Sequence, residues 1–201
     1  MKKGFSLVEM LVVIGIIAVL IGASIGAYSK MTAGAERAKC QELVSNTATA
    51  LTVLFQKEGV WPRVLRSQGS SDGELDASAA LPLAKYMSLT TNSDGSQLSG
   101  LDRFGIVSPW AAAVIKRKGS SASVSDKVGD VTVKDHILHY ALDLDGDGII
   151  DGASVGGESV AVRATAIVWC CGKDGKMEEY SKGIRSDDVY SWTKGQTQNV
   201  K

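Results

Sequence analysis

An apolar run near the N-terminus, from Phe5 to Tyr28, constrains this chain more than any other feature. It reads FSLVEMLVVIGIIAVLIGASIGAY, and Glu9 is its only charged residue. A helix of this length reaches roughly 36 Å, which exceeds a hydrocarbon core of about 30 Å. Lys2 and Lys3 precede the run, and the positive-inside tendency then leaves the N-terminus in the cytoplasm. We therefore expect one membrane-spanning helix, with the rest of the chain on the outer face.

Two ordinary explanations account poorly for this run. A secretory signal has an apolar stretch of about 7 to 15 residues, whereas this run is longer and has an acid near its start. A plain single-pass anchor fits the length but gives no reason for a carboxylate in the membrane, which costs at least about 2.5 to 3.5 kcal/mol near the bilayer centre. The position of Glu9 therefore indicates that a partner stabilises its carboxylate.

The start of the chain resembles the prepilin family, whose signature is a short basic leader ending in Gly, then Phe, then Glu at the fifth mature position. The leader at residues 1–4, Phe5 and Glu9 all fit this signature. The resemblance implies that a prepilin peptidase cleaves between Gly4 and Phe5 and methylates the new N-terminus. It also implies that the Glu9 carboxylate pairs with the Phe5 amine of an adjacent subunit, which offsets the cost of a buried charge.

The helical periodicity continues beyond the apolar run. Seven residues share one face by their spacing of three, four and seven: Cys40, Leu43, Val44, Thr47, Leu51, Leu54 and Phe55. Gly59 and Pro62 supply a stop, because glycine accepts the left-handed cap and proline cannot continue a helix. We expect one helix from about Phe5 to Glu58, with a membrane and filament-core half at residues 5–28 and an amphipathic half at residues 29–59.

The rest of the chain, residues 60–201, is expected to form an extracytoplasmic globular domain. Apolar alternation predicts strands at Val131–Val133, Ile137–Leu144 and Ser159–Cys171, and the last of these should cover the helix. A short helix is expected around Ser78–Tyr86. The predicted fold class is therefore α+β, a pilin-like long helix packed on a small antiparallel sheet.

Three cysteines follow the membrane run, in a compartment where disulfides persist. Cys40 lies on the apolar face of the helix and Cys170 on the apolar face of the last predicted strand. We hypothesise a disulfide between Cys40 and Cys170, with Cys171 pointing outward as a free thiol. The alternative is that all three cysteines are small buried hydrophobic residues.

An acidic loop predicts a calcium site. Aspartates occupy positions 1, 3, 5 and 9 of an EF-hand-like pattern, with Gly148 at position 6: Asp143, Asp145, Asp147 and Asp151. Calcium takes about six to eight oxygen ligands, and the backbone carbonyl of Ile149 at position 7 is a further candidate. Position 12 is Ser154 rather than Glu, so the remaining ligands stay open. The alternative is a solvated Asp/Gly turn between two strands.

The C-terminal part is similar to the major pseudopilins of type II secretion. A glycine-rich segment from Gly172 leads into Asp187, Asp188, Val189 and a final Trp192. In those proteins a C-terminal loop binds calcium that stability and assembly require. This chain carries its aspartate run earlier, at residues 143–151, so the ligand positions do not transfer directly to Asp187 or Asp188.

Together the two resemblances imply a structural subunit of a type IV pilus or of a type II secretion pseudopilus, without separating the two. The implied partners are further copies of the chain and related pilins, a prepilin peptidase and an inner-membrane assembly platform. The implied location is the inner membrane, with a single pass, and then a periplasmic or cell-surface filament. The alternative is a monomeric, membrane-anchored, extracytoplasmic calcium-binding domain.

Other function classes lack support in the sequence. The formal net charge is zero and no long basic tract occurs, so the electrostatic footprint of nucleic-acid binding is missing. Two G-x-S-x-G strings, centred on Ser24 and Ser154, lack a hydrolase context. The first lies in the membrane run, and His136 and His139 both precede the second instead of following it. We expect no enzymatic activity.

Overall fold

A computed structural model describes residues 7–87, 104–180 and 187–198, without the side chains of residues 23–27, 29, 30, 194 and 198. The chain divides into two compact units, Met1–Glu36 and Arg37–Lys201. Helix α1, Leu7–Glu58, crosses the boundary between them. The prediction of one continuous helix is thus confirmed from Leu7 onward, while Phe5 lies outside the described residues.

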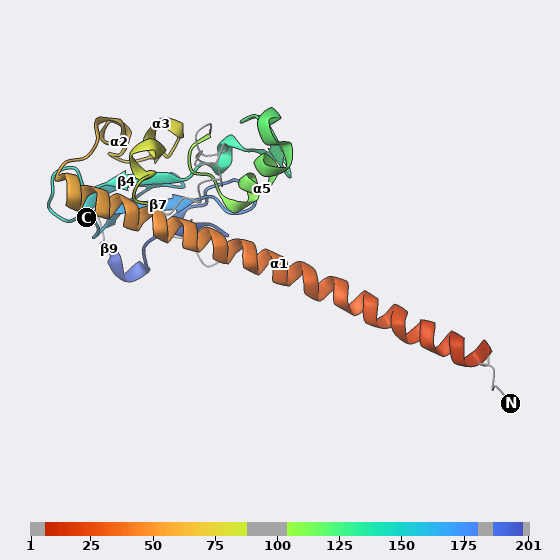
Figure 1. The fold of residues 1–201 in the computed structure, drawn as a ribbon. Helices are drawn as coiled ribbons and strands as arrows, with labels where there is room; N and C mark the ends of the chain where they lie inside the picture. The colour runs from red at the N-terminus through yellow and green to blue at the C-terminus, as the bar shows by residue number, and fades with distance from the viewer. Residues whose placement is uncertain (1–6, 88–103, 181–186, 199–201) are drawn as a thin grey trace. The chain divides into compact units, whose positions relative to one another are not determined.

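The part of α1 in the second unit packs by the face that the periodicity predicts. Cys40, Val44, Thr47 and Leu51 are fully buried and Leu54 is nearly so, whereas Leu43 and Phe55 are partly buried. Apart from Thr47, these side chains share one core cluster with residues of the main sheet. Figure 1 shows the last turns of α1 beside strands β4 and β7. Core packing therefore stabilises this half of the helix, as is usual for amphipathic helices.

Helix α1 ends where the stop signal predicts. Gly59 has a φ of 71° and donates its N–H to the carbonyl of Phe55 at 2.8 Å. Glycine adopts this left-handed conformation without the steric cost of a Cβ atom. The chain then returns, and the ring of Trp61 stacks on that of Phe55 with centroids 4.6 Å apart.

The main sheet is antiparallel and has the order β1–β4–β7–β8. Its strands are β1 at Gly73–Glu74, β4 at His139–Leu142, β7 at Ala166–Cys170 and β8 at Val189–Tyr190. A second antiparallel sheet has the order β5–β6–β9, with β5 at Ile150–Val155, β6 at Glu158–Val162 and β9 at Thr197–Gln198. A two-stranded ribbon pairs β2, Lys127–Val128, with β3, Val131–Thr132. The α+β fold class is confirmed.

Strand β7 is buried on both faces. Ala166, Val168 and Cys170 belong to the cluster that α1 covers, whereas Ile167 and Trp169 belong to a second cluster with β5 and β6. The expectation that the last predicted strand, Ser159–Cys171, covers the helix is therefore confirmed for the part of it that forms β7. The helix and the second sheet enclose β7 between them.

The prediction of one strand over Ser159–Cys171 is wrong. A bend at residues 163–165 separates β6 from β7, and the two strands belong to different sheets. Apolar alternation continues through the bend because the strands on both sides of it are buried, so the period of two does not reveal the change of sheet. The predicted strand Ile137–Leu144 is shorter in the structure, where β4 covers only His139–Leu142.

Several short helices cover the rest of the second unit. Helix α2 spans Arg63–Gln68, α3 spans Ala77–Ala80, the 3₁₀ turn η1 spans Leu81–Leu83 and α5 spans Pro109–Lys118. The single helix predicted around Ser78–Tyr86 is wrong in detail, since α3 ends after one turn and continues as η1. The Asp76 carboxylate starts α3 by accepting the N–H groups of Ser78 and Ala79. Helices α2 and α5 were not predicted, although proline at the first turn of α5 is a known start signal.

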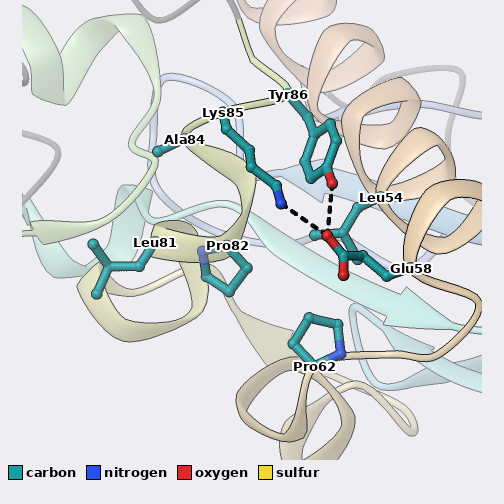
Figure 2. Close-up of a pocket in the computed structure, with 8 residues that line it drawn as sticks. All are labelled: Leu54, Glu58, Pro62, Leu81, Pro82, Ala84, Lys85 and Tyr86. Atoms are coloured by element: carbon teal, nitrogen blue, oxygen red, sulfur yellow. Dashed lines mark hydrogen bonds and ion pairs between the residues drawn. The ribbon is translucent and has the colours of Figure 1, made fainter.

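A shallow cavity of about 510 Å³ lies at the C-terminal end of α1 (Figure 2). The Glu58 carboxylate accepts hydrogen bonds from Lys85 Nζ and from the Tyr86 hydroxyl, each at 2.8 Å. Pro62 and Pro82 also line the cavity. The ion pair is exposed to solvent, so we expect it to contribute little to stability.

Candidate functional site

The helix surface of the first unit is apolar and exposed. Every large apolar side chain described from Leu7 to Ile21 is between 48% and 81% exposed. Soluble monomeric proteins rarely expose a continuous apolar surface of this kind. We therefore expect lipid or other apolar helices to cover it.

No helix in the described part of the chain is both long and apolar enough to cross a membrane. The span predicted over residues 5–28 includes residues 5 and 6 and the side chains of residues 23–27, which are outside the described part. Gly4 and Phe5, the predicted cleavage residues, are outside it too. Glu9 lies in the first turn of α1. The span, the cleavage and the role of Glu9 stay predictions.

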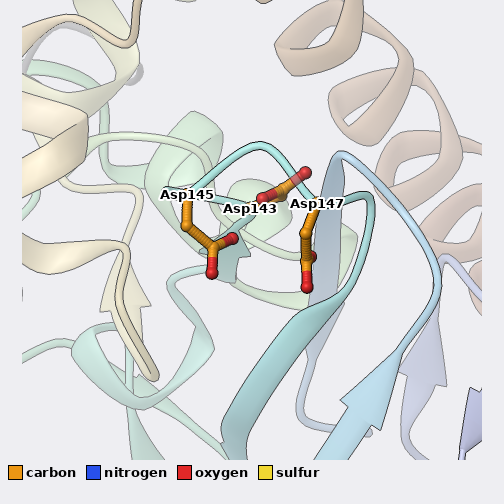
Figure 3. A group of neighbouring side chains, drawn as sticks. All are labelled: Asp143, Asp145 and Asp147. Carbon is orange, nitrogen blue, oxygen red and sulfur yellow. The ribbon is translucent and has the colours of Figure 1, made fainter.

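The acidic loop joins β4 to β5 and brings three aspartates together (Figure 3). Asp143, Asp145 and Asp147 each offer a carboxylate oxygen, and these three oxygens lie within 4.8 Å of one another. Asp143 is 6% exposed, whereas the other two are exposed. The sequence pattern thus identified three neighbouring carboxylates correctly.

Tertiary contacts hold the first aspartate of this loop in place. The N–H of Asp143 donates to the Thr165 carbonyl at 3.0 Å, and the indole Nε1 of Trp61 donates to the Asp143 carbonyl at 2.8 Å. The Asp143 carboxylate itself accepts the N–H groups of Gly146 and Gly148, at 2.7 and 2.9 Å. These contacts arrange the loop from the Asp143 end. The contact with Trp61 could not be found from sequence, since the two residues are far apart along the chain.

The remaining predicted ligands are placed differently. Asp151 lies in β5 with an exposed side chain, and its carboxylate is not among the three grouped oxygens. The Ile149 N–H donates to Asp147 at 2.7 Å. Three carboxylates are hard oxygen donors of the type that calcium prefers, but calcium needs about three to five further oxygens from carbonyls or water. The donor set fits calcium chemically, and binding stays a prediction.

We expect calorimetry on the detergent-solubilised full chain to record heat when calcium is added. Replacing Asp145 and Asp147 together by asparagine is expected to weaken binding at least about tenfold, because two charges are removed from the ion. Asp151→Asn is the matched control and should change the affinity less, since its carboxylate is outside the group. The absence of any calcium heat from the unmodified chain would support the solvated turn.

The three cysteines are free thiols in this structure, and all three are buried. The Sγ atoms of Cys40 and Cys170 are hydrogen-bonded, and this contact together with burial raises the pKa of Cys170 far above its ordinary value. Burial raises the pKa of Cys171 to about 12. The expectation that Cys171 points outward is wrong, since it is only 4% exposed. Its burial depends on tertiary packing, which strand alternation alone does not predict.

The carboxylates of the two C-terminal aspartates, Asp187 and Asp188, accept hydrogen bonds from backbone N–H groups. Asp188 is 3% exposed, and its carboxylate accepts the N–H groups of Gly172 and Glu178, each at 3.0 Å. The Asp187 carboxylate accepts the Lys173 N–H at 2.7 Å. Neither belongs to the group of metal-type ligands found among the described residues. These hydrogen bonds connect the segment after β7 with the residues just before β8.

The histidines do not form a hydrolase site with Ser154. His136 is fully buried, its Nδ1 lies 3.1 Å from the Ser108 hydroxyl, and burial lowers its pKa. His139 instead pairs with Asp72 at 2.7 Å and stacks on Trp169. The two histidines therefore contact different partners, Ser108 and Asp72, and neither partner is Ser154.

Comparisons with known proteins agree with the N-terminal signature. The model of the prokaryotic N-terminal methylation motif matches residues 1–25. The type IV major pilin protein PilE of Neisseria gonorrhoeae is 32% identical over 69 residues, which are 34% of this chain and 41% of that pilin. A fimbrial protein of Neisseria meningitidis serogroup A is also 32% identical over 69 residues, with the same two shares. The N-terminal third of this chain is thus similar to type IV pilins.

The similarity is limited to part of each chain. The chain spans about two fifths of the length of these pilins, and no solved structure matches it. The motif matched at residues 1–25 includes Gly4, Phe5 and Glu9. The relatives are named as a major pilin and a fimbrial protein, and neither name is that of an enzyme.

Proposed function

We propose that this chain is a structural subunit of a type IV pilus or of a type II secretion pseudopilus. The inner membrane holds the subunit first, with the second unit outside, and α1 then polymerises with copies of itself or with related pilins. One observation carries the proposal: the N-terminal methylation motif at residues 1–25 includes the start of helix α1, whose apolar side chains are exposed there. Neighbouring helices in a filament would bury this surface.

Processing would prepare the subunit for assembly. In the proposal a prepilin peptidase cleaves after Gly4 and methylates Phe5, and an inner-membrane assembly platform then moves the subunit out of the bilayer. The Glu9 carboxylate would pair with the Phe5 amine of the neighbouring subunit. A buried charge needs such a partner, because an unpaired one costs several kcal/mol.

Calcium, if bound at Asp143, Asp145 and Asp147, would stabilise the second unit. The ion would reduce the repulsion among three neighbouring carboxylates and so stabilise the loop between β4 and β5. This same group of ligands favours the second candidate function, a monomeric membrane-anchored calcium-binding domain. The two candidates differ in whether the chain polymerises.

The mass of the N-terminal peptide tests the processing step. We expect the chain from cells that contain a prepilin peptidase to begin at Phe5 and to carry an N-methyl group. Cells without the peptidase are the control and should yield a chain that begins at Met1. A start at Met1 in both would support a plain anchor, and a start after Ser24 or Ala27 would support a secreted protein.

A further inference from the structure

Two thiols from distant parts of the chain meet in the core of the second unit. Cys40 lies on α1 and Cys170 is the last residue of β7, and both side chains are fully buried. They belong to the same core cluster, and their Sγ atoms are in hydrogen-bond contact. Cys171 is not a member of that cluster.

Neighbouring contacts hold this turn of the helix over the strand. Gln41, the residue after Cys40, donates from Nε2 to the Tyr190 carbonyl at 2.9 Å. Strand β8 carries Tyr190 and pairs with β7, so that Val189 lies opposite Cys170. Helix α1 therefore contacts β8 next to the point where β8 pairs with β7. The hydrogen bond from Gln41 to Tyr190 supports the proximity of the Cys40 and Cys170 thiols independently of the thiol contact itself.

We propose that Cys40 and Cys170 form a disulfide that links α1 to the main sheet, while Cys171 remains a thiol. Cys171 follows the end of β7 and is outside the core cluster that contains Cys40 and Cys170. The proposal relies on the proposed function for one condition, an extracytoplasmic location in which a disulfide persists.

The reaction is a thiol–disulfide exchange with a disulfide-bearing oxidoreductase. One cysteine thiolate attacks the donor disulfide, which forms a mixed disulfide and releases one donor thiol. The second cysteine thiolate attacks the mixed disulfide, forms the Cys40–Cys170 bond and releases the second donor thiol. The two cysteines lose two protons and two electrons in total, and the donor disulfide takes up both pairs to become two thiols.

The disulfide forms during folding, before the core closes. The attacking species is the thiolate, and burial makes the thiolate scarce in the closed core. The donor must therefore reach the cysteines before α1 settles on the sheet. Once formed, the disulfide transmits a force on α1 directly to the main sheet. The part of α1 in the second unit then cannot separate from that sheet.

Thiol counting on the full chain tests the pairing. Cells that export the protein are quenched with an alkylating agent, and the chain is denatured without reductant and mapped as peptides. We expect alkylation at Cys171 alone and a linked peptide pair that contains Cys40 and Cys170. Reduction before alkylation should label all three cysteines. A bond that includes Cys171 would overturn the proposal, as would three labelled cysteines without reduction both in this sample and in a refolded chain.

Two further samples separate the pairing from the location. Cys171→Ala is expected to keep the link and to show no alkylated cysteine. The purified chain refolded with oxidised glutathione should form the same link. A link in the refolded chain but free thiols in the exported chain would support the pairing and contradict the proposed location, whereas free thiols in both overturn the pairing.

Discussion

Replacing Glu9 by alanine is expected to abolish filaments while leaving the chain in the membrane fraction. In the proposed filament, the variant leaves the Phe5 amine of the neighbouring subunit buried without its carboxylate. Breaking a buried ion pair costs about 3–5 kcal/mol. This corresponds to a fall of roughly two to three and a half orders of magnitude in the subunit association constant. Electron microscopy of sheared filaments and membrane fractionation measure the two outcomes.

Glu42→Ala is the matched control for this experiment. Glu42 is also an acid on α1, but it follows the apolar run and its side chain is exposed. Filament yield from this variant should stay close to that of the unmodified chain. Normal filaments from Glu9→Ala would remove the proposed pairing, and the same monomeric state with and without Glu9 would favour the anchored calcium-binding domain.

Gly156→Ala is expected to lower the free energy of unfolding of the second unit by about 2–5 kcal/mol, from two costs that add. Gly156 and Gly157 form the turn between β5 and β6 with φ values of 60° and 84°. A left-handed conformation costs a residue with a Cβ atom about 1–2 kcal/mol. A Cβ atom at residue 156 would also lie 2.0 Å from the Glu178 carbonyl oxygen, and such overpacking costs about 1–3 kcal/mol more.

Gly157→Ala separates these two costs. A Cβ atom at residue 157 would meet no atom within 4 Å, so this variant has the backbone strain without the clash. We expect it to lose only about 1–2 kcal/mol. Urea unfolding of both variants, followed by tryptophan fluorescence, gives the comparison. Equal losses would show that the segment around Glu178 moves aside freely and does not pack firmly on the turn.

Periodicity was sufficient for the helix in the second unit. All seven residues of the predicted face are buried or partly buried, because a helix that packs on a sheet must repeat its apolar residues every three or four positions. The end at Gly59 was equally local, since it depends on one backbone conformation. Local rules of this kind act within a few residues of the chain.

The same reasoning failed between β6 and β7. A strand buried on one face and a strand buried on both can carry the same alternation, so Ser159–Cys171 was predicted as one strand. The burial of Ile167 and Trp169 depends on a second sheet, whose strands come from other parts of the chain. Packing, and not the pattern of β7 itself, decided where the strand ends.

For the candidate site, the sequence by itself determined the features that depend on a short local pattern. These are the leader motif, the acid in an apolar run and the three neighbouring aspartates of the loop. Tertiary structure alone decided that Trp61 holds Asp143, that Asp151 stays outside the group, and that the thiols of Cys40 and Cys170 touch. The physical reason is distance along the chain. A turn or a helix face follows from the backbone geometry of a few successive residues, whereas contacts between remote segments depend on how every intervening element packs.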